Sequence, residues 1–417
     1  MMAGNRMGRR DFVAKSVAAG VGAWAASGNA RVLGAADRVR LGLIGAGARG
    51  LDLVRQALEA PNTELIAVAD VYARRHDEAR NFVPGVRAFS DHRQLLDLKD
   101  VDAVLVASPL HCHARHFLDT VAAGKDLYCE KTMTWSIAEA DACRQAAAKS
   151  DRVVQVGLQH VSTGAFVDAK QWLTDGLVGK VTSVESWMSR NTPRGVGQWV
   201  RPVPSDCTAA TVAWDAFLNG RPARPFDGFA FINWRLFWEF SGGNVTENMV
   251  HQMSWIMGLL DLPLPTAASM SGGIFSEKDR REVPDTIAVT FEFPTDLVVT
   301  WQSTFSNSHY GLGERVLGSH GTIERLSGST DMVTGRLTSG VHYYPEPANR
   351  ANGEAVTGRA PDGNHMATFL DCVRSRRRPN APVELGYRTA VAAHMANLAY
   401  RARQRITLED ALSSSGR

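Results

Sequence analysis

Short apolar runs alternate with amphipathic stretches along the chain from residue 37 to about residue 157. The runs are typical of strands that are buried on both faces of a sheet. Between them, apolar residues recur at helical spacing, as Leu51, Val54 and Leu58 do, and one such stretch ends at Gly124. The alternation predicts a doubly wound parallel sheet over residues 37–157. The expected strands are VRLGLI (39–44), ELIAVA (64–69), VDAVLVA (101–107), DLYC (126–129) and VVQVG (153–157).

After Gly157 the pattern changes to alternating apolar and polar residues, which predicts half-buried strands. Residues 181–189 alternate in this way. Residues 285–306 form two strand patterns around a Pro-Thr-Asp turn, and residues 314–326 form two more around a glycine. We therefore expect an α/β domain with an open, mainly antiparallel sheet over residues 158–383, with one face against the first domain. A last helix is expected to pack back on the first domain, followed by a tail, over residues 384–417.

The N-terminal segment, residues 1–36, differs from both domains. Arg9 and Arg10 lie just before Phe12, and a weakly apolar stretch rich in Ala and Gly follows. A charged start, an apolar stretch and small residues at a cleavage point are typical of an export signal, and adjacent arginines indicate the twin-arginine type. An amphipathic first helix is the alternative. We expect a periplasmic or exported protein, cleaved after residue 30 or 36, and no stable membrane insertion, because the stretch is short and glycine-rich.

Composition and charge narrow the classes of function. The 417 residues are 44% apolar and 21% charged, as is usual for a globular protein, and the length is enough for two domains. The net charge is only +3 and no basic run is present, so nucleic acid is not an expected partner. The five cysteines are an odd number without a C-x-x-C pair and predict no disulfide framework.

A glycine-rich loop follows the first predicted strand. It has the pattern G-x-G-x-x-G between a strand and a helix, the setting in which backbone N–H groups bind a pyrophosphate. Asp70 ends the next strand twenty residues after this loop, where a carboxylate binds a ribose 2′-hydroxyl group. Asp70 favours NAD because it would repel a 2′-phosphate, but Arg74 and Arg75 follow it and leave NADP open. The alternative is a glycine-rich helix start with an unrelated acid. The expected cofactor contacts from the loop are Gly45, Gly47, Ala48, Arg49 and Gly50.

Two unlike charges, Glu130 and Lys131, follow directly on the apolar run that ends at Cys129. They form either a solvated loop tip or part of a site. Ligands bind at the carboxyl ends of the strands in sheets of this kind. We therefore expect the pair to face the nicotinamide half of the cofactor.

The segments LGLIGAGARG, VAD and SPLHCHARHFLDTVAAGKDLYCEK resemble the glucose–fructose oxidoreductase/inositol dehydrogenase (Gfo/Idh/MocA) family. The resemblance runs from about residue 39 to residue 408. One family motif is E-K-P, in which members often have a cis bond before the proline; here Thr132 replaces that proline. The resemblance implies a substrate-binding second domain and pairing of copies of the chain through its open sheet. It also implies cofactor contacts from the residues that match the family motifs, which are Ser108, Pro109, His113, Glu130 and Lys131.

Glu247 and His251 lie four residues apart in GGNVTENMVHQMSW, a spacing that places both on one face of a helix. The family form, G-G-x-x-x-D-x-G-x-H, implies a site role for His251 and for Glu247 in place of Asp. A surface Glu–His pair is the alternative. Oxidation of a secondary alcohol requires loss of the hydroxyl proton, which suits a histidine or a lysine of lowered pKa. We expect Lys131 to contact the reacting hydroxyl group and His251 to transfer the proton, although exchanged roles would also fit.

The aromatic-rich stretch 211–240 is expected to form a wall of the substrate site, with core packing of the same residues as the alternative. The expected substrate contacts are Gln159, His160, Trp214, Trp234, Arg235 and His251, with Trp238 as a further candidate. The sequence HCHARH (111–116) resembles a metal cluster, but companion ligands are not evident, so no metal is expected.

Together these features predict an NAD(P)-dependent oxidoreductase that acts on a secondary hydroxyl group of a sugar, glycoside or cyclitol. Soluble NAD(P) is not regenerated outside the cytoplasm, so export would require a tightly held cofactor that is recycled internally. Two alternatives stay open. One is an NAD-dependent glycoside hydrolase that oxidises a ring carbon transiently, and the other is a non-catalytic nucleotide-binding protein.

Overall fold

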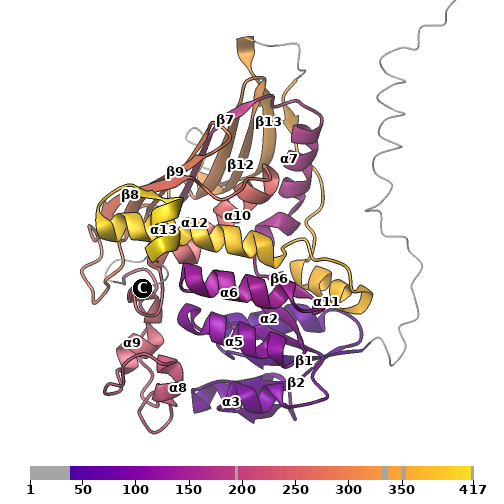
Figure 1. Cartoon of the computed structure of the whole chain (residues 1–417), viewed down its shortest axis with the longest axis vertical. Helices are drawn as coiled ribbons and strands as arrows, with labels where there is room; N and C mark the ends of the chain where they lie inside the picture. The colour runs from indigo at the N-terminus through magenta and orange to yellow at the C-terminus, as the bar shows by residue number, and fades with distance from the viewer. Residues whose placement is uncertain (1–37, 193–195, 331–336, 349–353, 415–417) are drawn as a thin grey trace, which may run out of the picture. The chain divides into compact units, whose positions relative to one another are not determined.

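The computed structural model describes residues 38–192, 196–330, 337–348 and 354–414 (Figure 1). The expected export signal, residues 1–36, lies outside these ranges and stays a prediction. From Val39 onward the chain forms one unit, which contains two sheets with helices on their faces.

The first sheet is parallel and has the strand order β3-β2-β1-β4-β5-β6. Both β4 and β5 are buried along their whole length, because helices cover both faces of the sheet. The doubly wound sheet is thus confirmed, with the short edge strand β3 added to the expected ones. The strands are β1 (Val39–Ile44), β2 (Thr63–Ala69), β3 (Arg87–Phe89), β4 (Ala103–Val106), β5 (Asp126–Cys129) and β6 (Val154–Val156).

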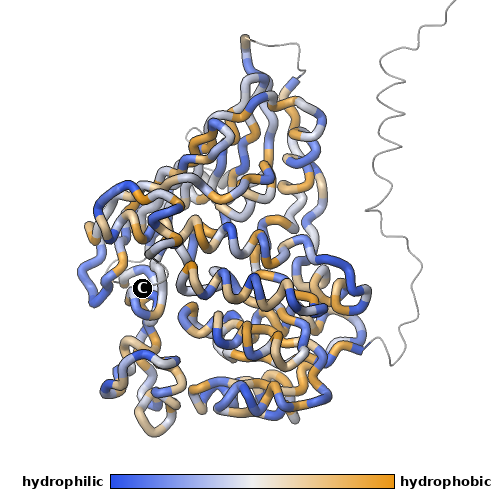
Figure 2. The backbone as a smooth tube through the Cα atoms, in the orientation of Figure 1, coloured by the Kyte–Doolittle hydropathy of each residue, from blue (hydrophilic) through white to orange (hydrophobic). Residues whose placement is uncertain are grey.

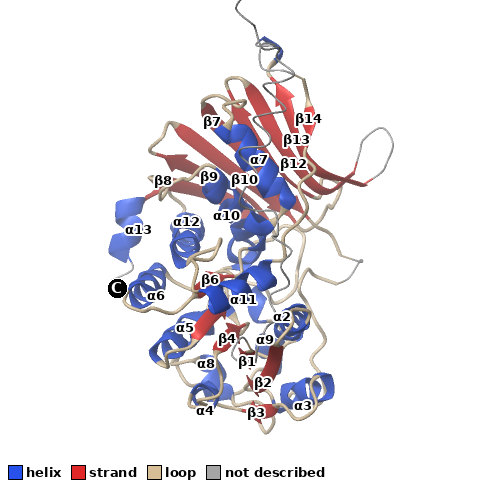
Figure 3. Ribbon diagram, turned by 90° about the vertical axis from the view of Figure 1, so that its right-hand side faces the viewer, coloured by secondary structure: helices blue, strands red, loops and turns tan. Residues whose placement is uncertain are grey.

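Helices α2 and α3 lie on one side of this sheet and α5 and α6 on the other (Figure 3). A capping box of Ser136 and Glu139 starts α6. The Ser136 side chain accepts a hydrogen bond from the backbone N–H of Glu139, and the Glu139 side chain accepts one from the backbone N–H of Ser136. The helices of this domain are α2 (Ala48–Leu58), α3 (Ala73–Phe82), α4 (His92–Leu96), α5 (His113–Ala122) and α6 (Ile137–Ala148).

The second sheet has the order β14-β13-β12-β11-β7-β10-β9-β8-β15, and only its β7–β10 pair is parallel among the described strands. The expected hairpins 285–306 and 314–326 are β9–β10 and β11–β12, so the mainly antiparallel sheet is confirmed. The strands are β7 (Val181–Ser189), β8 (Ala267–Gly273), β9 (Thr286–Phe293), β10 (Leu297–Thr304), β11 (Leu312–Gly318), β12 (Gly321–Thr330), β13 (Leu337–Pro345), β14 (Val356–Thr357) and β15 (Ile406–Thr407).

One face of the second sheet is covered and the other is open. In β10, buried Leu297, Val299 and Trp301 alternate with outward-facing residues such as Val298 and Gln302. The covering helices are α7 (Gly164–Thr174), α10 (Val250–Leu259) and α12 (Val383–Ala402) (Figure 3). The open face carries a broad hollow of about 1190 Å³.

The last long helix, α12, contacts α6 and β6 of the first domain and β8 and β9 of the second sheet. Over residues 389–397 it is buried on every side. The preceding helix, α11 (His365–Ser375), packs against α2 and β1, where Phe369 and Leu370 join the core. The end of the chain therefore completes the packing of the first domain. A short helix, α13 (Leu408–Ser414), follows.

The aromatic-rich stretch forms α8 (Trp214–Leu218), α9 (Gly228–Ile232) and the turn η4 (Trp234–Leu236). We call residues 199–240 the strap. Its backbone is bonded to the segment after β2: Ala73 N–H donates to Thr211 O at 2.9 Å, and Ala213 N–H donates to Val71 O at 2.8 Å. Its aromatic side chains form a separate small core. The strap is thereby held against the first sheet, near Asp70.

Apolar and polar residues are interspersed along the whole described chain (Figure 2). No helix within the described ranges is long and apolar enough to cross a membrane. All five cysteines are buried thiols.

Candidate active site

The glycine-rich loop joins β1 to α2 and leaves its backbone accessible. Gly45 has a φ of +92°, and a Cβ there would lie 2.6 Å from Ser108 N. A Cβ at Gly50 would lie 2.0 Å from Gly45 O. Gly47, by contrast, faces open space, and no described side chain caps the start of α2. The first N–H groups of α2 are therefore available to a phosphate, which fits a dinucleotide.

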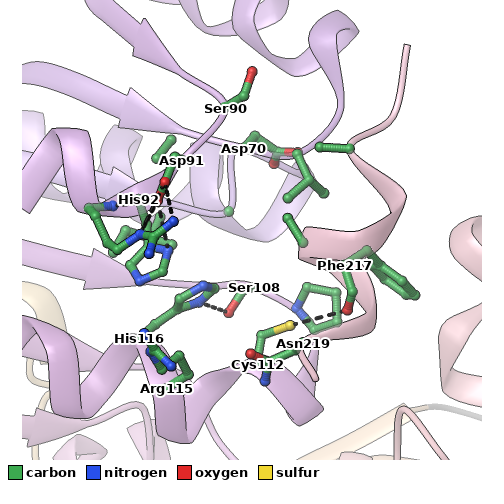
Figure 4. A pocket seen from close by; sticks show the side chains of 18 of the residues that line it. Asp70, Ser90, Asp91, His92, Ser108, Cys112, Arg115, His116, Phe217 and Asn219 are labelled. Carbon is green, nitrogen blue, oxygen red and sulfur yellow. Dashed lines mark hydrogen bonds and ion pairs between the residues drawn. The ribbon is translucent and has the colours of Figure 1, made fainter. Parts of the chain in front are cut away.

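A cavity of about 370 Å³, the first cavity, lies beside this loop (Figure 4). Asp70 faces it from the end of β2, and its carboxylate accepts N–H bonds from Ala46 at 2.8 Å and Tyr72 at 2.9 Å. Burial raises the pKa of Asp70, although these N–H groups oppose the shift. The predicted cofactor residues that line this cavity are Gly45, Asp70, Ser108 and Pro109.

The strap forms part of the wall of the first cavity, through residues 213–219. Figure 4 shows Phe217 and Asn219 on the strap, with His92 across the cavity from them. The strap is tied to the loop after β4, because Phe217 O is 2.6 Å from His111 Nε2 and Asn219 Nδ2 donates to His111 O at 2.8 Å. A nucleoside in this cavity would thus meet residues of both domains.

Arg74 and Arg75, the two arginines that could have bound the 2′-phosphate of NADP, form ion pairs outside the first cavity. Both pair with Glu78 and do not line the first cavity. The guanidinium groups that do line it, Arg93 and Arg115, pair with carboxylates close by in the sequence. The carboxylate at the end of β2 is therefore the group placed to meet a ribose.

A second cavity, of about 540 Å³, contains residues of both domains. Lys131 follows β5, whereas Glu247 and His251 belong to the second domain, and all three line this cavity. Lys131 Nζ donates to Glu247 O at 2.8 Å and lies 3.7 Å from Glu247 Oε2. The Lys131–Thr132 peptide bond is cis. Ser108 lines both cavities, so they adjoin.

Glu247 holds two cations in this cavity. Arg235 Nε donates to Glu247 Oε2 at 2.8 Å, and Ser241 Oγ donates to Oε1 at 3.3 Å. Burial opposes ionisation of Glu247, but Lys131 and Arg235 outweigh it and keep its pKa below the usual value. Burial also lowers the pKa of Lys131, against the attraction of the carboxylate. Lys131 therefore gives up a proton more readily than a solvated lysine.

Two predicted cofactor residues line the second cavity but bond to the protein itself. Glu130 Oε1 accepts from Arg49 Nε at 2.9 Å. His113 bonds to two backbone carbonyl groups, those of Ser108 and Thr132, each at 2.8 Å. These contacts fix the loops after β4 and β5, which carry the cavity walls.

His251 lies in the first turn of α10. Its ring centroid is 5.2 Å from that of His160, whose Nδ1 lies 3.1 Å from an amino group of Arg325. Burial, with the nearby charge of Lys131, lowers the pKa of His251 well below its usual value, and burial lowers that of His160 to about 3. His251 Nδ1 has no hydrogen-bond partner among the described residues. A neutral imidazole therefore lines the cavity.

Residues 245–249 form a π-helical turn that runs directly into α10 at Val250, and Glu247 and His251 both line the cavity, as their spacing predicted. Two other predicted substrate contacts lie elsewhere. Trp214 lines neither cavity, because its ring stacks on Phe217 at 5.1 Å in the core of the strap. His160 packs behind His251 rather than lining the cavity.

The other predicted substrate contacts, Gln159, Trp234 and Arg235, line the second cavity. Trp238 does not, and packs against Tyr400 instead. Gly47, Ala48 and Gly50 line neither cavity. The sequence analysis missed lining residues after the end of β7, in the strap and in the turn that precedes α10. They are Arg190, Gln198, Trp199, Arg201, Asn233 and Asn248.

The histidines of HCHARH bond within the protein. His111 contacts Phe217 O, His113 contacts two carbonyl groups, and His116 Nδ1 lies 2.9 Å from Ser108 Oγ. Across the residues that the structure describes, no group of three or more His, Cys, Asp or Glu side chains is gathered that could hold a metal ion.

Comparison with known families assigns both domains. Residues 39–158 match the oxidoreductase family with the NAD-binding Rossmann fold, and residues 215–324 match the GFO/IDH/MocA C-terminal domain. These two ranges together cover more than half of the chain. The chain belongs to the Gfo/Idh/MocA oxidoreductase family. Its first domain is therefore an NAD-binding domain, in agreement with the accessible loop backbone and with Asp70.

Inositol 2-dehydrogenases are among the relatives within the Gfo/Idh/MocA family. That of Klebsiella pneumoniae is 35% identical over 150 residues, which are 34% of this chain and 43% of that protein. The match therefore spans less than half the length of this relative. That of Acidothermus cellulolyticus is 26% identical over 297 residues, 70% of this chain and 74% of that protein. An aldose–aldose oxidoreductase from Caulobacter crescentus shares the fold, with a TM-score of 0.66 and 18% identity over 89% of this chain and 99% of that chain.

Proposed function

We propose that this protein is an NAD-dependent oxidoreductase that removes hydride from a secondary hydroxyl group of a sugar, glycoside or cyclitol. The observation that carries the proposal is the second cavity, where Lys131 of the first domain and His251 of the second line one space. This space adjoins the first cavity at Ser108. The similarity to inositol 2-dehydrogenases supports a polyol substrate.

Lys131 and His251 divide the proton chemistry in this proposal. The Lys131 ammonium group, held by Glu247, hydrogen-bonds the reacting hydroxyl oxygen and stabilises the charge that develops when its proton leaves. His251 is neutral and accepts that proton. A bound nicotinamide supplies the hydride acceptor. Exchanged roles of Lys131 and His251 also fit, because the pKa values of both groups are lowered.

The proposed cofactor is NAD rather than NADP. A 2′-phosphate in the first cavity would meet the carboxylate of Asp70, which is already fixed by two N–H groups. Arg74 and Arg75, the nearest arginines along the chain, are turned to Glu78. Charge repulsion therefore favours the unphosphorylated ribose.

We further propose that the cofactor is held tightly and that the protein is exported to the periplasm. The strap supports the first point, because it lines the first cavity and is bonded to His111, so it can add contacts to a bound nucleoside. The arginine pair before an apolar stretch supports the second. An exported enzyme with a captive cofactor would oxidise one substrate and reduce another, or return the hydride to the same substrate after an elimination, as a redox-assisted glycosidase does.

The open face of the second sheet supports a further proposal, namely a homo-oligomer. Its large hollow and the exposed Phe275 and Tyr310 on its wall leave this face uncovered in the single chain. Sedimentation of the purified protein would test this directly.

The test of function begins with protein purified under native conditions. Its absorbance and the mass of the released nucleotide identify the cofactor. A panel of sugars, inositols and aryl glycosides is then added, and reduction of the bound cofactor is followed by absorbance. We expect reduction by a polyol, and loss of this reduction in Lys131→Met.

Lys180→Met serves as the matched control. Lys180 is an exposed lysine that pairs with Asp296 and does not line the cavity. Reduction that survives unchanged in Lys131→Met, or the absence of any bound nucleotide and any nucleotide binding, would contradict the proposal. Release of phenol from an aryl glycoside without net reduction would assign the glycosidase variant instead. Nucleotide binding without reduction by any member of the panel would indicate a non-catalytic protein.

A further inference from the structure

The second cavity carries an excess of positive charge. Among the described residues that line it, five are Arg or Lys and two are carboxylates. The cations are Arg49, Lys131, Arg190, Arg201 and Arg235, and the carboxylates are Glu130 and Glu247. The excess is three positive charges. A neutral sugar would not require such a wall, and clustered cations in a partly buried space repel one another.

Both carboxylates already form ion pairs with three of these cations. Glu130 pairs with Arg49, and Glu247 pairs with Lys131 and Arg235. Neither acid is within an ion-pair distance of Arg190 or Arg201. The side chains of these two arginines have no ion pair or hydrogen bond within the described part of the chain.

The backbone, rather than the side chain, holds each of the two arginines in place. Arg190 N–H donates to Thr304 O at 2.9 Å, just beyond the β7–β10 pair. Arg201 N–H donates at 2.7 Å to the side chain of buried Asn233, which donates back to Arg201 O. The guanidinium groups are therefore presented to the cavity by well-fixed backbone while remaining available to a ligand.

Both arginines share the second cavity with the residues of the proposed chemistry. Arg190 is near enough to His251 for its charge to lower the pKa of that imidazole. Burial, and then the charge of Arg235, lowers the pKa of Arg201. Arg235 itself binds Glu247. Burial, and no carboxylate, shifts the pKa of Arg190. The two guanidinium groups thus line the same cavity as Lys131 and His251.

The cofactor alone does not neutralise this excess. The pyrophosphate of NAD carries two negative charges, and its oxidised nicotinamide carries one positive charge. Even if the whole cofactor faced this cavity, two of the three excess charges would remain. Guanidinium groups bind carboxylates and phosphates through paired N–H bonds, so an anionic ligand group fits this wall.

We infer that the substrate is an anionic cyclic polyol, such as a uronic acid or a sugar phosphate, whose carboxylate or phosphate is bound by Arg190 and Arg201. This inference rests on the proposed function, since it names the substrate class of the same cavity. The anionic group would fix the ring so that one secondary hydroxyl group lies against Lys131 and His251. A charge-assisted hydrogen bond contributes roughly 10- to 100-fold to affinity.

The test is calorimetric titration of the holoenzyme with four probes: D-glucuronate, glucose 6-phosphate, D-glucose and myo-inositol. We expect at least one of the two anionic probes to bind about 10-fold or more tightly than glucose, and the difference to shrink as salt is raised. The glucuronate and phosphate arms distinguish a carboxylate from a phosphate. In Arg190→Gln and Arg201→Gln the anionic advantage should fall by about 10-fold or more, with the affinity for glucose changed less than about twofold.

Arg405→Gln is the matched control, because Arg405 pairs with Glu292 on the surface and does not line the cavity. An unchanged melting temperature and bound-nucleotide spectrum confirm that each variant is folded. Equal affinity for charged and neutral probes, or an anionic advantage that survives in both cavity variants, would overturn the inference. Should neutral polyols bind and reduce the bound cofactor as well as the anionic ones, this inference fails while the proposed function stands. If no probe binds, both fail.

Discussion

The buried ion pair between Glu314 and Arg325 offers a sharp test of how the second sheet supports the site. Glu314 on β11 is fully buried and Arg325 on β12 is nearly so. The pair is bidentate, with one N–O distance of 2.7 Å, and Arg325 also reaches His160 behind His251. Replacing Glu314 by Gln removes the charge that balances Arg325 in a region with little water.

Breaking a buried pair from one side destabilises a protein by about 3–5 kcal/mol, because the remaining charge stays buried without its partner. The unfolding entropy is about 2.1 cal/mol/K per residue, or roughly 0.8 kcal/mol/K for a unit of about 380 residues. Glu314→Gln should therefore lower Tm by about 4–6 °C, which differential scanning calorimetry measures directly.

The surface pair Glu292–Arg405 is a matched control. It has the same bidentate form, with distances of 2.8 and 2.7 Å, but its side chains are 45% and 50% exposed. Exposed pairs contribute about 0.2–1 kcal/mol, so Glu292→Gln should lower Tm by about 1 °C or less. Equal shifts in the two variants, or a shift below about 1 °C for Glu314→Gln, would refute the reasoning. The double variant Glu314→Leu/Arg325→Met should recover part of the loss, since it buries no charge.

Further predictions concern the chemistry, the cofactor and the effect of pH. Lys131→Met should reduce the rate of hydride transfer by about 10²- to 10⁴-fold in stopped-flow absorbance measurements, and Lys131→Arg should restore little of it because the planar guanidinium group cannot take the same place. Asp70→Ser should weaken NAD binding and raise the ratio of NADP to NAD affinity about 10-fold or more in titrations, since a repelling charge is lost. The buried His111, His365 and His394 have pKa values lowered by burial to about 3, 4 and 4. They stay neutral in the native state while the unfolded chain takes up protons below about pH 6.5, so their effect is absent above that pH and stability falls as the pH drops from 6.5 towards 4. The loss is up to about 1.4 kcal/mol per histidine per pH unit, and a Tm that does not fall by several degrees between about pH 7 and 5.5 would contradict it.

Local sequence patterns predicted the first domain well, because its features depend on neighbours in the chain. A parallel strand covered on both faces must be apolar along its length, as β4 is, so it is visible without knowledge of its partners. The loop between Gly45 and Gly50 and the charge at Lys131 are equally local, since each directly follows a strand end.

The remaining features depend on contacts between distant segments. Trp214 and Trp234 look alike in the sequence, but only the second lines a cavity, because α8 turns Trp214 into the core of the strap. Arg190 and Arg201 lie in no motif, and their position is set by Thr304 and Asn233. The parallel pairing of β7 with β10 joins residues more than 100 positions apart. No local pattern records such pairings.

The place of α11 and α12 has a consequence for how the chain matures. These two helices, the last long ones before the C-terminal tail, seal the flanks of a sheet whose strands end at residue 156. The order of synthesis and the order of assembly therefore differ: the nucleotide-binding half emerges from the ribosome first but is finished last. Until α12 is synthesised, the sides of α6 and β6 that it covers lack their native partner. A cellular process that accepts only folded chains would therefore depend on synthesis of the C-terminal helices. A chain that stopped before residue 365 would lack the packing of α11 and α12 even though every predicted cofactor-binding residue was present.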